Sequence, residues 1–272
     1  MAFFQVNFFS KSLKRQVPFT AFVPVDTFDI PGQEPVERGP IKSLYLLHGY
    51  AGNHMDWSLG AKIQELSLIH NTAVFMPSGE NNFYLDDSDK GELHAEFIGN
   101  ELVEFTRKTF PISSNREDTF IGGLSMGGFG ALRNGLKYSQ HFSKIIALSS
   151  ALITRNIAGI PEDFKDPIAD YNYYRRVFGD LNELLGSDKD PEALILNLKK
   201  DNADNPENPE KAVIPHIYMA CGTEDFLLKE NRAYHEFLEN EGVEHTYIEA
   251  PGVHDWKFWN EYIEKAMKWA TV

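Results

Sequence analysis

The chain has 272 residues, of which 42% are hydrophobic and 24% are charged. This balance is that of an ordinary folded protein and excludes a disordered chain or a collagen-like repeat. The single cysteine, Cys221, also excludes a disulfide scaffold. A formal net charge of −14 repels phosphate backbones and anionic lipid headgroups, so we expect neither nucleic acid nor a membrane as a partner.

The apolar N-terminal stretch predicts a strand over residues 3–9. Polar Gln5 and Asn7 interrupt it, which is unlike a signal peptide. No apolar run approaches the roughly 20 residues of a membrane span, so we expect a cytoplasmic protein. A second strand over 18–25 is followed by the turn-rich stretch 30–40, which predicts an antiparallel pair at one edge of a sheet.

From residue 42 onward, apolar strands alternate with amphipathic helical patterns. Further strands are expected at 42–48, 72–76, 118–122, 144–149, 213–221 and 244–249. Helices are expected near 59–70, 92–108, 126–138, 229–241 and 255–270. This alternation predicts an α/β fold with a mostly parallel central sheet and helices on both of its faces.

Residues 151–212 interrupt the alternation with many Asp, Asn and Pro residues, including the run DNADNPENPE. Because strand and helix resume directly afterwards, we interpret this stretch as a small cap insertion in one domain spanning 1–272. Its first half holds Tyr171, Tyr173, Tyr174 and Phe178 between charged residues. That pattern predicts a fixed, partly aromatic pocket wall, with Tyr174 as a candidate substrate contact, and not a membrane-seeking lid.

The sequence Gly123-Leu124-Ser125-Met126-Gly127 follows a predicted strand and opens a predicted helix. This is the context of the nucleophile turn of α/β hydrolases, in which a serine projects from a tight turn at the carboxyl end of the sheet. The small residues on either side of Ser125 permit that turn. We therefore predict that Ser125 is a nucleophile on an α/β-hydrolase fold.

A serine nucleophile needs an imidazole base and an orienting carboxylate, which follow it in the order acid, then histidine. Asp225 lies after a predicted strand, with Glu224 as an adjacent competitor that the residues alone do not exclude. His254 lies after the next strand, before the last helix. His216 and His245 fall inside predicted strands and are weaker candidates for the base.

The strand over 42–48 ends in His48-Gly49-Tyr50, an HG-type motif. We expect the backbone amides of Tyr50 and Met126 to form the oxyanion hole, and His48 to brace the loop. His54 and His94 are interpreted as loop or surface residues. The acidic run 86–91 does not place ligands as a calcium loop does, and we expect no metal and no cofactor.

The strings LLHGYAGNHMDW, FIGGLSMGGFGAL, CGTEDFL and HDWKFW resemble the esterase D branch of α/β hydrolases, and within it the bacterial tributyrin esterases. The resemblance covers about residues 3–269. It implies Ser125, Asp225 in preference to Glu224, and His254 as the triad, and Trp57 as a residue that shapes the pocket. The chain departs from the branch at Tyr50 and Asp255, and these departures concern substrate preference.

We therefore expect a serine carboxylesterase that hydrolyses acetyl to butyryl esters, or aryl esters, through an acyl-enzyme. The partner is a small-molecule ester, and the sequence leaves a homo-oligomer open. One alternative is a feruloyl or acetyl-xylan esterase, or a thioesterase resembling S-formylglutathione hydrolases. The thioesterase branch usually has a cysteine after the HG motif, which this chain lacks. A noncatalytic binding protein on the same fold is disfavoured because no triad residue is missing.

Overall fold

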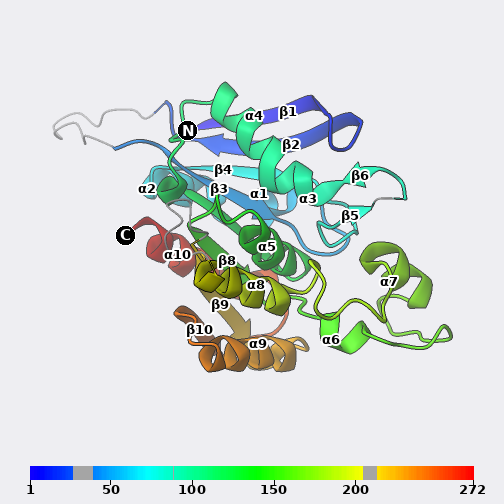
Figure 1. Ribbon diagram of the computed structural model, residues 1–272. Helices are drawn as coiled ribbons and strands as arrows, with labels where there is room; N and C mark the ends of the chain where they lie inside the picture. The colour runs from blue at the N-terminus through cyan, green and yellow to red at the C-terminus, as the bar shows by residue number, and fades with distance from the viewer. Residues whose placement is uncertain (27–38, 88, 205–212) are drawn as a thin grey trace.

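A computed structural model describes residues 1–26, 39–87, 89–204 and 213–272. Its centre is an eight-stranded sheet with the order β1-β2-β4-β3-β7-β8-β9-β10 (Figure 1). The strands are β1 Ala2–Ser10, β2 Arg15–Val23, β3 Lys42–Leu47, β4 Thr72–Pro77, β7 Thr119–Leu124, β8 Lys144–Leu148, β9 His216–Gly222 and β10 His245–Ala250. A separate hairpin pairs β5, Asp86–Asp87, with β6, Glu92–Leu93.

The sheet is parallel from β4 to β10 and antiparallel only at one edge. That edge is the β1–β2 pair, as the sequence predicts. Side chains of β1 alternate between exposed and half-buried, whereas β4 and β7 are buried along their whole length. This difference follows from position, because a central parallel strand is covered on both faces.

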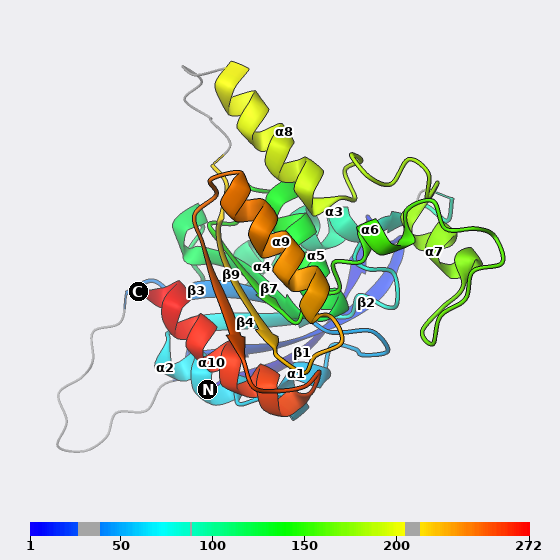
Figure 2. The ribbon, with the colours of Figure 1, turned by 90° about the horizontal axis from the view of Figure 1, so that it is seen from below.

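Helices cover both faces of the sheet (Figures 1 and 2). They are α1 Asp56–Gly60, α2 Ile63–Ile69, α3 His94–Glu96, α4 Leu102–Thr109, α5 Met126–Lys137, α6 Thr154–Ile157, α7 Tyr171–Phe178, α8 Pro191–Asp204, α9 Leu228–Asn240 and α10 Trp256–Thr271. One apolar core lies between the sheet and α1, α2 and α10. The other lies under α4, α5, α8 and α9. The α/β fold with helices on both faces is thus confirmed.

Two expected helices differ in detail. The helix expected over 59–70 is two short helices, because α1 ends at Gly60, where the Trp256 ring packs so closely that a Cβ would lie 2.4 Å from it. The helix expected over 92–108 is α3 and α4 joined by a π-helical turn, Phe97–Glu101. Hydrophobic periodicity alone does not predict either difference.

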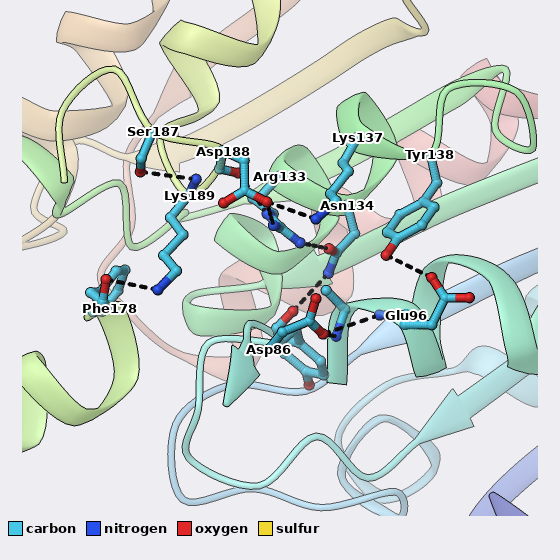
Figure 3. Close-up of polar contacts among 12 residues, drawn as sticks. Asp86, Glu96, Arg133, Asn134, Lys137, Tyr138, Phe178, Ser187, Asp188 and Lys189 are labelled. Atoms are coloured by element: carbon cyan, nitrogen blue, oxygen red, sulfur yellow. Dashed lines mark hydrogen bonds and ion pairs between the residues drawn. The ribbon is translucent and has the colours of Figure 1, made fainter. Parts of the chain in front are cut away.

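The described part of the insertion carries α6, α7 and α8, and its loop docks on α5 through Arg133 (Figure 3). The Arg133 side chain, 1% exposed, donates to the carbonyl of Asp188 at 2.9 Å and to its carboxylate at 2.7 Å. Lys137 donates to the same carboxylate at 2.7 Å, and Lys189 donates to the carbonyl of Phe178 at 2.9 Å. The insertion is therefore tied to the helix that follows the candidate nucleophile.

Some of the sequence expectations fall on residues that the structure does not describe. Residues 30–38 of the turn-rich stretch and residues 205–212 of the insertion lie outside the described residues, while 201–204 form the end of α8. Within the described residues, no helix has both the length and the apolar character needed to cross a membrane.

Candidate active site

Ser125 stands on a strained turn between β7 and α5. Its backbone has φ 54° and ψ −120°, a region that L-residues rarely adopt and that costs about 1–3 kcal/mol. The turn also needs glycines beside it, since a Cβ on Gly123 would lie 2.3 Å from the Gly127 carbonyl. A Cβ on Gly127 would lie 2.4 Å from the Leu47 carbonyl. The chain thus holds Ser125 at the carboxyl end of β7, where the residue is 9% exposed.

His254 connects Ser125 to a carboxylate. Its Nε2 lies 3.0 Å from Ser125 Oγ, and its Nδ1 lies 2.8 Å and 3.0 Å from the two oxygens of Asp225. The ring packs between Phe226, at 4.5 Å between centroids, and Trp259, at 4.9 Å. The structure therefore brings together the three residues that the sequence predicts for the triad.

Asp225 is buried, and Glu224 points elsewhere. Burial alone raises the pKa of Asp225, but hydrogen bonds from His254 and from the Leu227 N–H outweigh it, so the pKa lies below the usual value and the group stays ionised. Glu224 is exposed and accepts instead from the Gly252 N–H at 2.7 Å. The geometry thus favours Asp225 as the carboxylate partner of the imidazole.

The two expected oxyanion-hole amides flank Ser125. Met126 is the first residue of α5, where the N–H has no intrahelical acceptor. Among the described residues, the Tyr50 N–H has no acceptor either. Gly49 brings this loop against the nucleophile turn, since a Cβ there would lie 2.7 Å from Leu124 Cδ1 and 3.5 Å from Ser125 Cβ. Both amides are thus placed on the backbone that surrounds Ser125.

His48 braces that loop. Its Nε2 accepts from the Gly79 N–H at 2.8 Å, which assigns the proton to Nδ1, and Nδ1 donates to the Gly49 carbonyl at 2.7 Å. Burial lowers its pKa, so the ring stays neutral. The buried Tyr84 hydroxyl donates to the His48 carbonyl at 2.9 Å, a contact that no local sequence signal predicts.

A cleft of about 710 Å³ opens beside Ser125. Tyr174, the candidate substrate contact, lies in its wall and donates to Asp166 at 2.7 Å. Tyr173 lies beside it and packs against Tyr50 at 5.9 Å between centroids. The remaining wall is mostly apolar and comes largely from the insertion; it includes Phe83, Met126, Ala151, Ile153, Ile157, Phe164, Pro167, Ile168, Phe226 and Leu227.

Trp57 does not line this cleft, and its expected role as a pocket residue is wrong. The side chain is 1% exposed in the core under α10, where its Nε1 donates to the Leu47 carbonyl at 2.8 Å. It packs edge-on against Trp256 at 5.3 Å. Trp57 therefore supports the end of β3, and the walls of the cleft come largely from the insertion.

Asn231 is a residue that the sequence analysis missed. It is fully buried, accepts from the Ser150 N–H at 3.1 Å and donates to the Ser150 carbonyl at 2.9 Å. The next residue, Ala151, donates its N–H to the Ser125 carbonyl at 3.0 Å. Asn231 therefore ties α9 to the segment that contacts the nucleophile, and only its place on the face of the helix that meets the core distinguishes it in sequence.

One cluster in the described residues has the composition of a metal site. Ligand atoms of Glu80, Glu92 and His94 lie within 4.8 Å of one another. Arg15 already pairs with both carboxylates, so a cation there would have to displace a guanidinium. His94 is fully buried, and the expectation of a loop or surface position is wrong for it.

Comparison with known proteins identifies the family. A family model described as "Putative esterase" matches residues 10–270. The chain belongs to this esterase family. An acetyl esterase of Caldicellulosiruptor saccharolyticus is 59% identical over 271 residues, which are 100% of this chain and 98% of that protein.

Solved structures of serine hydrolases share the fold. A fluorophosphonate-binding serine hydrolase of Staphylococcus aureus, described as substrate-bound, matches with a TM-score of 0.83 and 25% identity over 100% of this chain and 98% of that one. An S-formylglutathione hydrolase from Staphylococcus aureus matches with a TM-score of 0.78 and 26% identity, over 100% and 99%. The chain is accordingly a serine carboxylesterase with an α/β-hydrolase fold.

Proposed function

We propose that Ser125, His254 and Asp225 hydrolyse short-chain carboxylic esters through an acyl-enzyme. The observation that carries this proposal is the continuous hydrogen-bonded line from Ser125 Oγ through His254 to Asp225. A serine, an imidazole and a buried carboxylate in this geometry perform acyl transfer on several unrelated folds.

In the first step, Ser125 Oγ attacks the ester carbonyl while His254 Nε2 takes the hydroxyl proton. The carbonyl oxygen becomes an oxyanion that the Tyr50 and Met126 amides stabilise. His254 then gives its proton to the departing alcohol, leaving an ester on Ser125. Water repeats the sequence on the acyl-enzyme, releases the acid and restores the serine hydroxyl.

The substrate is an acetyl to butyryl ester. The name of the 59% identical acetyl esterase supports this, as do the aromatic cleft walls, which also accommodate an aryl leaving group. We propose that the insertion is a fixed cap on a single domain, tied down through Arg133 and Asp188. Self-association and a cytoplasmic location stay predictions.

Ser125→Ala tests the nucleophile. We expect kcat on p-nitrophenyl acetate to fall about 10⁴-fold or more, because the triad acts as a unit. A fluorophosphonate probe should label the wild-type protein and leave the variant unlabelled. A purified Ser125→Ala protein that kept a tenth of the activity, or that still took up the label, would remove Ser125 from the mechanism.

A chain-length series tests the acyl preference. We expect kcat/KM for p-nitrophenyl esters to be highest between C2 and C4 and to fall towards C12, with no rate jump beyond the solubility limit. A burial gain of about 0.8 kcal/mol per methylene does not offset a clash with a fixed wall. An optimum at C8 or longer, or activation on emulsions, would instead identify a lipase.

A thioesterase is the second candidate, favoured by the S-formylglutathione hydrolase of similar structure. The missing cysteine after the HG motif argues against it. Comparing kcat/KM for S-formylglutathione, a feruloyl ester and phenyl acetate separates the three substrate classes, and we expect phenyl acetate to be the best of them.

A further inference from the structure

A second cavity of about 260 Å³ lies beside the active-site cleft. Asn156 on α6 and Glu230 on α9 line both spaces, so these two side chains stand between them. They are joined by one hydrogen bond, from Asn156 Nδ2 to Glu230 Oε1, at 2.7 Å. The two spaces therefore share this side-chain pair in their walls.

Two buried polar atoms around this cavity have no hydrogen-bond partner among the described residues. They are Glu230 Oε2 and the hydroxyl of Tyr234, whose side chain is 2% exposed. The two residues are four apart on α9, so they lie on the same face of the helix. A buried polar group without a partner costs about 1–3 kcal/mol, so such groups in a cavity are typical of a site for a polar ligand.

The charges around the cavity are largely balanced. Arg155 forms an ion pair with Glu192 at 2.5 Å. Asp190 accepts from the backbone N–H groups of Gly186 and Glu192. Lys229 also lines the cavity, but its side chain is exposed. Among the described residues, the buried atoms with unused hydrogen-bonding capacity here are therefore Glu230 Oε2 and the Tyr234 hydroxyl, and a neutral donor such as a hydroxyl matches them.

We propose that this cavity is a subsite for the leaving alcohol of the ester, and that Glu230 and Tyr234 select alcohols that carry further hydroxyl groups. This inference rests on the proposed esterase function. Clefts of roughly 300–1,000 Å³ hold drug-sized ligands, so a short acyl group fills only a fraction of the 710 Å³ beside Ser125. The remaining space is available to the alcohol, and the Asn156–Glu230 pair lies in its wall.

Both unused atoms are enclosed, so a ligand reaches them only when the two side chains rotate toward the cavity, and a polyol would then give each atom a partner. One hydroxyl donates to Glu230 Oε2, and a second accepts from or donates to the Tyr234 hydroxyl. An alkyl alcohol of the same shape would leave both atoms buried and unpaired. Sites built to pair a substrate hydroxyl reject the analogue that lacks it by large factors for this reason.

The test uses two acetates of matched shape, pentaerythritol monoacetate and 2,2-diethylbutyl acetate, in which three hydroxyls replace three methyls. Released acetate gives kcat/KM for each, and the readout is their ratio. In the wild type, we expect a ratio of about tenfold or more in favour of the polyol ester, which is the factor that the net contribution of about one hydrogen bond gives.

Three variants separate the subsite from a structural role. Glu230→Leu removes the acceptor, and Tyr234→Phe removes only a hydroxyl that has no partner among the described residues, so the second should fold normally. Tyr218→Phe is the matched control, because its hydroxyl is also buried and unpartnered but lies in the other core, under α10. We expect the ratio to fall towards one in the first two variants and to stay at the wild-type value in the control.

The outcomes also separate this inference from the proposed function. If the wild type hydrolyses p-nitrophenyl acetate but shows no preference for the polyol ester, the subsite is wrong and the esterase proposal stands. An unchanged ratio in both Glu230→Leu and Tyr234→Phe overturns it as well. If the wild type hydrolyses no ester and Ser125 takes no label, the esterase proposal fails and the subsite fails with it.

Discussion

At the scale of single residues, the identity of the carboxylate decides the chemistry. Asp225 and Glu224 are adjacent, and both accept hydrogen bonds, but only Asp225 contacts the imidazole. Its carboxylate also accepts from the Leu227 N–H, which fixes its direction. The orientation of the imidazole therefore depends on a side chain held at the start of α9.

Asp225→Asn should lower kcat about 10⁴-fold, because an amide favours the wrong imidazole tautomer. Glu224→Gln should change kcat little, since it only alters the acceptor of the Gly252 N–H. Steady-state rates on p-nitrophenyl acetate at one pH make the comparison. The opposite ranking of the two variants would assign the acid to Glu224.

The functional residues that can be found from the sequence are those that the neighbouring residues identify. Ser125 sits among glycines, and His254 lies in a strand-end loop before a helix. Tyr84, Trp57 and His94 behave differently, because their roles depend on which distant segment covers them. Tyr84 supports His48, 36 positions away. A single chain carries no local mark of such a contact, so these roles become visible only once the fold is built.

At the scale of elements, α5 joins the nucleophile turn to the insertion. Its Arg133 is buried, whereas its partner Asp188 has a side chain 52% exposed. Burial lowers the pKa of Arg133, and the nearby carboxylate of Asp188 opposes that shift. The free-energy cost of removing a charge from water therefore falls mainly on Arg133, because Asp188 keeps much of its contact with solvent.

We expect Asp188→Asn to destabilise the protein more than Arg133→Met does. The first leaves a buried guanidinium without its main counter-charge, at a cost of about 3 kcal/mol, while the second removes the buried charge itself. Urea unfolding of both variants measures the difference. Equal losses, or a larger loss in Arg133→Met, would show that the pair acts through packing and not through charge.

At the scale of the whole molecule, the mostly parallel sheet and its two covered faces follow from the alternation of apolar strands and helices, and these were predictable, whereas the order of the strands was not predicted. The extent to which each histidine is buried could not be predicted from the sequence. Burial lowers the pKa of His48, His54, His70 and His141. These groups are spread over several elements, so several parts of the molecule contribute to its sensitivity to acid.

His94 should dominate this sensitivity. Burial, with a contribution from Arg15, lowers its pKa from 6.5 to about 4. Between about pH 6.5 and pH 4, the unfolded chain therefore binds a proton at this residue and the folded protein does not. The free energy of unfolding consequently falls as the pH drops through this range. The loss due to His94 alone is about 2–3 kcal/mol between pH 7 and 4.5.

His94→Gln should flatten the fall of the free energy of unfolding across that pH range, whatever its effect at pH 7. Urea unfolding at several pH values gives the slope, and His216→Gln is the control because His216 is exposed at the start of β9. The slope, and not the absolute stability, is the readout, since the substitution also changes packing beside Arg15. A His94→Gln protein that lost stability as steeply as the wild type would place the acid sensitivity in the other buried histidines.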